Sequence, residues 1–129
     1  MVSCGGDGGD DGPPPTPALP SNGVITVRAF DFGFGPESIA LSAGEEVRLV
    51  FRNEGDLLHN LKVDGIDVEV LDSQSTGPLS GDEGELFVGA DAGEEGYVTF
   101  VPQEPGEFEY YCTIPDHRAL GMEGTLIVR

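Results

Sequence analysis

The sequence predicts an all-β fold, a Greek-key antiparallel β-sandwich or barrel of about eight strands. Short alternating runs of Val, Ile, Leu and Phe recur along the chain, and Gly- and Pro-rich breaks separate them. The 129 residues include 20 Gly, 10 Pro and no Trp. No segment keeps apolar residues at i, i+3, i+4 and i+7 over three turns, so helices are not expected. This length suits one domain with one sizeable core.

Residues 1–22 precede the predicted strands and are dense in Gly, Asp and Pro. We expect a disordered, flexible tether that is not part of the fold. Within it, "VSCGG" resembles the end of a bacterial lipoprotein signal, whose cysteine receives a lipid, although the charged and apolar parts of such a signal are missing. We therefore expect lipid attachment at Cys4, and a chance cysteine in a tail is the alternative. A disulfide between Cys4 and Cys112 is not expected, because it would close a very long loop.

The domain is expected to span residues 23–129. The first run, "VITVRAF", places Ile25, Val27 and Ala29 on one face. The second, "EEVRLVFRN", alternates in the same way and turns its arginines to the other face. Further strands are predicted at HNLKV, DVEVL, ELFV, YVTFV, EFEYYC and GTLIV. Turns are predicted at GFGP, SAGE, NEGD, VDG, STGP, DAGEEG and QEPGE, and the main loops at residues 72–84 and 90–96.

The run "EFEYYC" has a phase that matters for function. Phe108, Tyr110 and Cys112 share one face, while two glutamates mark the other face as the solvated one. Cys112 is therefore predicted to point inward at the end of a strand.

The metal-binding residue types form one pattern. The only histidines are His59, which opens a predicted strand, and His117, which follows Cys112 in "CTIPDHRALGM". A sandwich can bring a strand end and a loop together at one pole. Two imidazoles, a thiolate and the thioether of Met122 then form the ligand set of a type 1, or blue, copper site. One hairpin supplies three of these ligands, with Pro115 stiffening its first half and Gly121 freeing its second.

Here the sequence resembles the cupredoxins, the blue copper proteins that include plastocyanin and azurin. The resemblance rests on "HN" at residues 59–60 and on "YYCTIPDHRALGM", and it extends over the body of the chain from residue 23 to residue 129. The Cys-x4-His-x4-Met spacing matches auracyanin, rusticyanin and sulfocyanin better than plastocyanin or azurin. Leu58, rather than Gly, precedes the first histidine, so a backbone carbonyl ligand of the azurin kind is not expected.

The resemblance implies one copper ion per chain, bound through Nδ1 of His59 and His117, the thiolate of Cys112 and, weakly, the axial Met122. It also implies residues around the ligands. Asn60 would brace the ligand loop near Thr113, and the backbone amides of Asn60 and Ile114 would point at the cysteine sulfur.

The function implied is one-electron transfer by copper cycling between Cu(II) and Cu(I). His117 would be the exposed ligand through which the electron passes. The expected partners are redox proteins, such as a cytochrome, an oxidase or a reductase, that dock on the apolar residues around it. These residues are Leu58, Ile114, Pro115, Ala119 and Leu120. The chain is expected to act as an extracytoplasmic monomer, attached to a membrane only through a lipid on Cys4.

Copper storage, delivery or sensing is the alternative function. An exchanging site usually exposes Met- or Cys-rich ligands, whereas this pattern is enclosed. An enzyme is not expected, because one site uses both histidines and leaves none for a second copper. Zinc would also fit a thiolate and two imidazoles in a recombinant preparation.

The net charge of −18 comes from 24 acidic and 6 basic residues. Nothing forms a basic stripe, so nucleic acid is excluded as a partner. The acidity fits either a solvated surface in a salt-adapted organism or electrostatic steering of a cationic partner.

Overall fold

A computed structural model describes residues 16–78, 81 and 84–129. The elements, in chain order, are β1 (Val24–Phe30), β2 (Gly33–Gly35), β3 (Ser38–Leu41), β4 (Val47–Asn53), β5 (His59–Val63), β6 (Val68–Gln74), β7 (Leu86–Ala90), β8 (Glu95–Pro102), β9 (Gly106–Tyr111), the 3-10 helix η1 (Arg118–Leu120) and β10 (Glu123–Val128). Helical structure in this part of the chain is thus limited to one short 3-10 turn.

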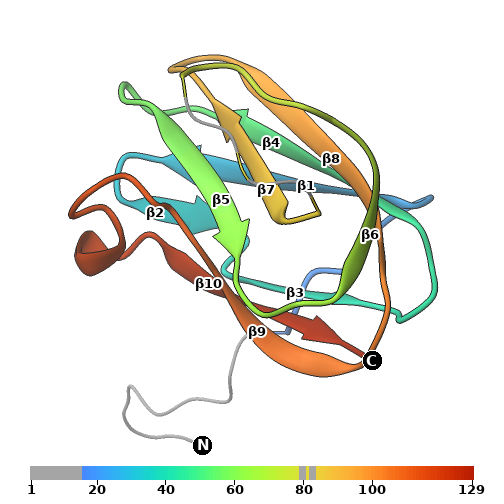
Figure 1. Cartoon of the computed structure of the whole chain (residues 1–129). Coiled ribbons are helices and arrows are strands. Elements are labelled where there is room, and N and C mark those ends of the chain that lie inside the picture. The colour runs from blue at the N-terminus through green and yellow to red at the C-terminus, as the bar shows by residue number, and fades with distance from the viewer. Residues whose placement is uncertain (1–15, 79–80, 82–83) are drawn as a thin grey trace, which may run out of the picture.

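The strands form two layers, which confirms the predicted sandwich (Figure 1). One five-stranded sheet has the order β2-β1-β4-β8-β6, and the other has the order β3-β10-β9-β5-β7. The loop that contains η1 lies at one end of β10, and the C-terminus lies at the other end (Figure 1). The sandwich therefore has a pole that carries the ligand loop and an opposite pole.

Two strand pairs are parallel, a detail that the predicted antiparallel sandwich did not include. β1 pairs with β4, and β3 pairs with β10, in parallel register. The physical reason is the path of the chain. After β1 and β2 the chain crosses to the other sheet as β3 and returns as β4, and parallel neighbours such as β1 and β4 require a crossover of this kind.

The predicted apolar alternation is confirmed in β1 and β4, where buried and exposed residues alternate along each strand. The turn predicted at "GFGP" is wrong in part, because residues 33–35 form the short edge strand β2 on β1. Phe34 of that strand is buried, but the flanking glycines conceal the strand pattern in the sequence. β6 also continues to Gln74, into the loop predicted at residues 72–84.

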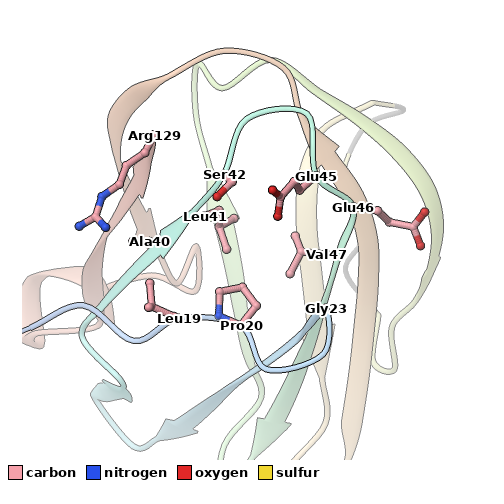
Figure 2. A pocket seen from close by; sticks show the side chains of 10 residues that line it. All are labelled: Leu19, Pro20, Gly23, Ala40, Leu41, Ser42, Glu45, Glu46, Val47 and Arg129. Atoms are coloured by element: carbon pink, nitrogen blue, oxygen red, sulfur yellow. The ribbon is translucent and has the colours of Figure 1, made fainter.

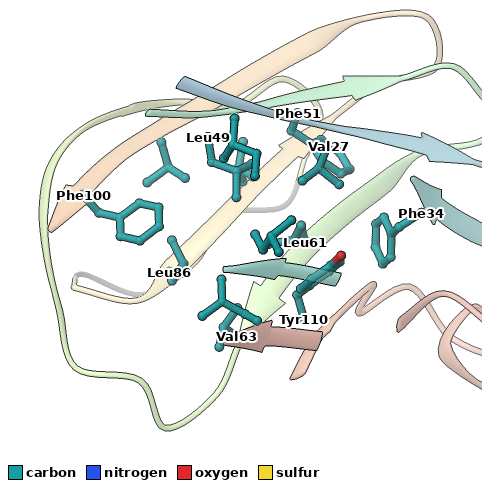
Figure 3. Close-up of a cluster of buried hydrophobic side chains, with 14 of the residues drawn as sticks. Val27, Phe34, Leu49, Phe51, Leu61, Val63, Leu86, Phe100 and Tyr110 are labelled. Atoms are coloured by element: carbon teal, nitrogen blue, oxygen red, sulfur yellow. The ribbon is translucent and has the colours of Figure 1, made fainter. Parts of the chain in front are cut away.

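The core fills the space between the sheets (Figure 3). Phe34, Phe51 and Tyr110 meet there in edge-to-face contacts, with ring centroids 5.5–6.3 Å apart. Cys112 and Met122 belong to this same cluster of buried residues. The sulfur-bearing side chains are thus continuous with the core.

Residues 16–22, expected as the end of the tether, are attached to the body. The amide of Ala18 donates to the carbonyl of Ser38 at 2.9 Å, and the amide of Ala40 donates to the carbonyl of Ala18 at 2.9 Å. This segment borders a pocket of about 270 Å³ with Leu19, Pro20 and Arg129 on its wall (Figure 2). The pocket lies at the pole opposite the ligand loop. Cys4 and the first part of the expected tether lie outside the described residues.

Candidate metal centre

The ligand loop joins β9 to β10 and is closed by its own backbone. The Cys112 amide donates to the Met122 carbonyl at 3.2 Å, and the Met122 amide donates to the His117 carbonyl at 3.1 Å. Gly121 has φ = 115°, a conformation that other residues adopt only under strain. These bonds bring the backbones of Cys112, His117 and Met122 together at one pole.

His59 reaches the same pole from β5, of which it is the first residue. Its ring centroid lies 5.0 Å from that of His117, and Nδ1 of His117 lies 3.6 Å from Sγ of Cys112. One ligand atom from each of these three residues lies within 4.8 Å of the other two, and all three residues are buried. The structure therefore brings together three of the four predicted ligands as a compact set of donor atoms.

The nitrogen atoms of His59 show that the set fits a metal ion. Nε2 lies 2.9 Å from Oδ1 of Asp31, whereas Nδ1 is buried and has no hydrogen-bond partner among the described residues. A carboxylate only accepts hydrogen bonds, so Nε2 carries the proton and Nδ1 keeps a free lone pair. A buried nitrogen without a partner is costly, and a metal ion held beside Cys112 would satisfy it.

Burial and hydrogen bonding act in opposite directions on the Cys112 thiol. Burial raises its pKa, while hydrogen bonds from the backbone amides of Asn60 and Ile114 lower it and leave a smaller net rise. A bound metal ion would displace the thiol proton, because thiolate is the form that binds metals. The two amides would then donate to the thiolate sulfur.

His117 is suited to bind as a neutral imidazole. Burial and the nearby His59 lower its pKa, against a smaller opposing effect of Asp31 and Asp116. His117 is 7% exposed, His59 and Met122 are 0% exposed, and Cys112 is 1% exposed. The histidine that the resemblance gives as exposed is therefore the most accessible of the four residues, but it is itself buried.

Asn60 holds the first residue of the ligand loop after Cys112. Its side-chain Nδ2 donates to the Thr113 hydroxyl at 2.8 Å, and its Oδ1 accepts the Thr113 amide at 2.7 Å. The register explains the contact. β5 and β9 pair Lys62 with Tyr111, and continuing that antiparallel register brings Asn60 opposite Thr113.

Three residues near the site escaped the sequence analysis: Asp31, Phe32 and Leu57. Asp31 accepts a hydrogen bond from His59, which lowers the pKa of its carboxyl. The ring of Phe32 meets that of His117 edge-on, with centroids 5.3 Å apart. Asp31 and Phe32 directly follow β1, far from the ligand loop in the sequence. Neither periodicity nor motif spacing could therefore reveal their contacts with His59 and His117.

The apolar residues expected around His117 differ in exposure. Pro115, Ala119 and Leu120 are exposed, whereas Leu58 and Ile114 are half-buried. Phe32, whose ring contacts His117, and Leu57, two residues before His59, add exposed apolar side chains. Across the described residues, no helix is long and apolar enough to cross a membrane.

Comparison with known proteins identifies a matching family. Residues 22–129 match the copper binding proteins of the plastocyanin/azurin family. Auracyanin-B of Chloroflexus aurantiacus is 35% identical over 81% of this chain, which covers 52% of that protein. The copper-resistant cuproprotein CopI of Pseudomonas aeruginosa is 27% identical over 89% of this chain and 81% of its own length.

Solved structures agree with the sequence comparisons. An auracyanin B structure superposes with a TM-score of 0.64 at 28% identity, over 89% of this chain and 91% of that one. A multicopper oxidase from Campylobacter jejuni has a TM-score of 0.62 over 90% of this chain and 31% of its own, but at 15% identity it shows the fold alone. With His59, Cys112 and His117 positioned to form a mononuclear copper site, the chain belongs to the plastocyanin/azurin family of copper binding proteins.

Proposed function

We propose that this chain is a one-electron carrier that holds a single type 1 copper ion. The observation that supports this most strongly is that its donor atoms are enclosed and already arranged. Nδ1 of His59 is buried and free, and Cys112 and His117 lie beside it. When bound, copper supplies a couple between Cu(II) and Cu(I) that these ligands accept in both states.

The surrounding residues keep the ligands in place. Asp31 holds the His59 ring, and Asn60 holds the loop at Thr113. Ligands that are fixed in this way move little when the charge at the centre changes, which favours rapid electron exchange. Their burial also excludes water, so few free ligand positions remain for exchange or for substrate.

Met122 is proposed as the fourth, axial ligand. It is fully buried, it packs in the same cluster as Cys112, and its backbone is hydrogen-bonded to the backbones of Cys112 and His117. A thioether is a weak, soft ligand of the kind found at the axial position of blue copper sites. Replacing it should therefore alter the reduction potential more than the retention of copper.

The proposed docking surface surrounds His117. Leu120 is 57% exposed and its amide donates to the His117 carbonyl, while Phe32 is 40% exposed and touches the His117 ring. Together with Ile114 and Pro115 these residues would give a small apolar contact for a redox protein. Small, short-lived interfaces are typical of electron-transfer encounters, and the electron would pass through His117.

Copper handling is the second candidate, because two relatives are named copper-resistant cuproproteins. A protein that delivers copper must release it, which the enclosed ligand set disfavours.

We place the electron carrier outside the cytoplasm, with a lipid on Cys4 as its membrane attachment, and we assign it no enzymatic activity. Both histidines of the sequence serve the one site.

The test is a visible spectrum with Cu(II), recorded before and after ascorbate, for the wild type and a Cys112→Ala variant. A carrier should show an intense thiolate-to-copper band that bleaches, returns on reoxidation and is missing in the variant. The reduced protein is then dialysed against a Cu(I) chelator. Retained copper supports electron transfer. A colourless copper complex, or rapid loss of copper to the chelator, would favour storage or delivery instead.

A further inference from the structure

Asp31, in the turn after β1, links the surface to the buried ligand His59. Its Oδ1 accepts a hydrogen bond from Nε2 of His59 at 2.9 Å. The histidine side chain is 0% exposed and the aspartate side chain is 33% exposed. A carboxylate that touches both solvent and a fully buried ring is more than a surface charge, because it selects which nitrogen of that ring carries the proton.

The carboxylate is itself held in place by the turn at residues 54–57. The Asp56 amide donates to both Asp31 oxygens at 3.1 and 3.2 Å, and the Leu57 amide adds a further hydrogen bond. Bonds to two backbone amides leave the carboxylate little freedom to rotate away from His59. Its direction is therefore set by the main chain.

A buried asparagine anchors that turn. Asn53 is 2% exposed, and its Nδ2 donates to the carbonyls of Leu57 at 2.8 Å and Ala90 at 2.9 Å. Its Oδ1 accepts the Gly55 amide at 2.9 Å. The position of Asp31 thus traces back to the end of β4 and to β7, which belong to different sheets.

Gly55 allows this close approach. A Cβ at this position would lie 2.3 Å from Oδ1 of Asp31 and 2.9 Å from Nε2 of His59. Real Cβ atoms do not approach other atoms so closely, and the backbone atoms nearby cannot yield cheaply. The turn therefore packs directly against the Asp31–His59 hydrogen bond, and only glycine fits there without displacing it.

We propose that Asp31 is a positioning residue of the copper centre. It fixes His59 as the Nε2–H tautomer with Nδ1 directed at the metal, and its negative charge, acting through the imidazole, favours Cu(II) over Cu(I). Carboxylates that hold metal-bound histidines in this way raise the basicity of the ligand. The inference rests on the proposed type 1 centre. The rival account is that Asp31 serves only to hold the turn at residues 54–57.

Three variants separate these accounts. Asp31→Asn keeps an oxygen acceptor for Nε2 but removes the charge, and Asp31→Ala removes both. Asp56→Asn is the matched control, since it removes one negative charge from an exposed side chain in the turn at residues 54–57, whose backbone holds Asp31. Three measurements are made on each: ¹⁵N NMR of the histidine rings in the copper-free protein, the Cu(II) affinity, and the reduction potential of the copper-loaded protein.

The expected results differ between variants. Asp31→Ala should mix the two tautomers of His59 and lower Cu(II) affinity about 10- to 100-fold. Asp31→Asn should keep the tautomer but raise the potential, and a tenfold loss confined to Cu(II) corresponds to about 59 mV for one electron. Asp56→Asn should change neither the tautomer nor the potential.

Two outcomes would overturn the proposal. One is an unchanged tautomer and potential in Asp31→Ala, with only its stability reduced. The other is an equal rise in potential in Asp31→Asn and Asp56→Asn, which would reflect general charge. If the wild type shows no reversible couple, the proposed function fails, and the NMR comparison in the copper-free protein still decides the role of Asp31. If Asp31→Ala does not fold, Asp31→Asn and its control decide between the accounts.

Discussion

The two hydrogen bonds between Asn60 and Thr113 provide a quantitative test of how the ligand loop is held. Asn60→Ala removes both hydrogen bonds at once from a side chain that is 1% exposed. The Thr113 amide loses its acceptor, which costs about 1–3 kcal/mol. The second bond is worth about 0.5–1.5 kcal/mol, part of which water recovers at the exposed Thr113 hydroxyl. We expect the free energy of unfolding to fall by about 2–4 kcal/mol, a large share of the roughly 5–15 kcal/mol typical of a domain.

Urea unfolding of the copper-free protein measures this loss, and a double-mutant cycle identifies its source. Thr113→Val breaks only the bond between Nδ2 and the hydroxyl, and it should cost about 1 kcal/mol in the wild type. In the Asn60→Ala background the same change should cost almost nothing, because its partner is already gone. Equal costs in both backgrounds, or a loss below about 0.5 kcal/mol for Asn60→Ala, would refute the claim that these two hydrogen bonds hold the ligand loop.

Three further predictions concern the core, pH and docking. Gly124→Ala should unfold the protein or markedly lower its stability, because the new Cβ would lie 2.3 Å from the ring of the fully buried Tyr110. Thermal unfolding checks this prediction, and an unfolding midpoint equal to that of the wild type would contradict it. Burial raises the pKa of the Tyr110 hydroxyl, which donates to the Pro36 carbonyl at 2.6 Å. The pKa of this tyrosine is thus higher in the folded protein than its unfolded value of about 10. The protonated hydroxyl therefore contributes stability below about pH 10, and that contribution is lost as the pH rises further. Tyr110→Phe should lose less stability above about pH 10 than the wild type, and identical pH slopes would be contrary evidence. Leu120→Glu should slow electron self-exchange severalfold in NMR line-broadening measurements. The control Leu71→Glu should not, because Leu71 lies on β6 and is 47% exposed against 57% for Leu120. Similar rates in both variants would remove Leu120 from the docking surface. Because two copies each carry −18 charges, added salt should speed this exchange by screening their repulsion.

The sequence alone carried the fold class and the ligand set. Alternating apolar runs specify which face of a strand is buried, and this rule held along β1 and β4. The order and residue types of His59, Cys112, His117 and Met122 indicated a copper site, since few other sites combine imidazole, thiolate and thioether. Such patterns are local, and local spacing is what a sequence displays directly.

The tertiary structure decided what depends on contacts between distant segments. The strand β2 was missed because its pairing with β1, and not its own composition, makes it a strand. The parallel pairs follow from the path of the chain between sheets, which no single run records. The end of the expected tether is likewise ordered by hydrogen bonds to Ser38 and Ala40, which lie about twenty residues further along.

Asp31 shows the same division most clearly. In the sequence it is one of 24 acidic residues, in a turn without a motif. Its role appears only when the turn at residues 54–57 folds over it and His59 comes within 2.9 Å. The sequence thus determined which atoms can bind copper, because ligand chemistry belongs to residue types. The folded chain decided the tautomer, burial and charge around those atoms, because these depend on neighbours that only folding brings together.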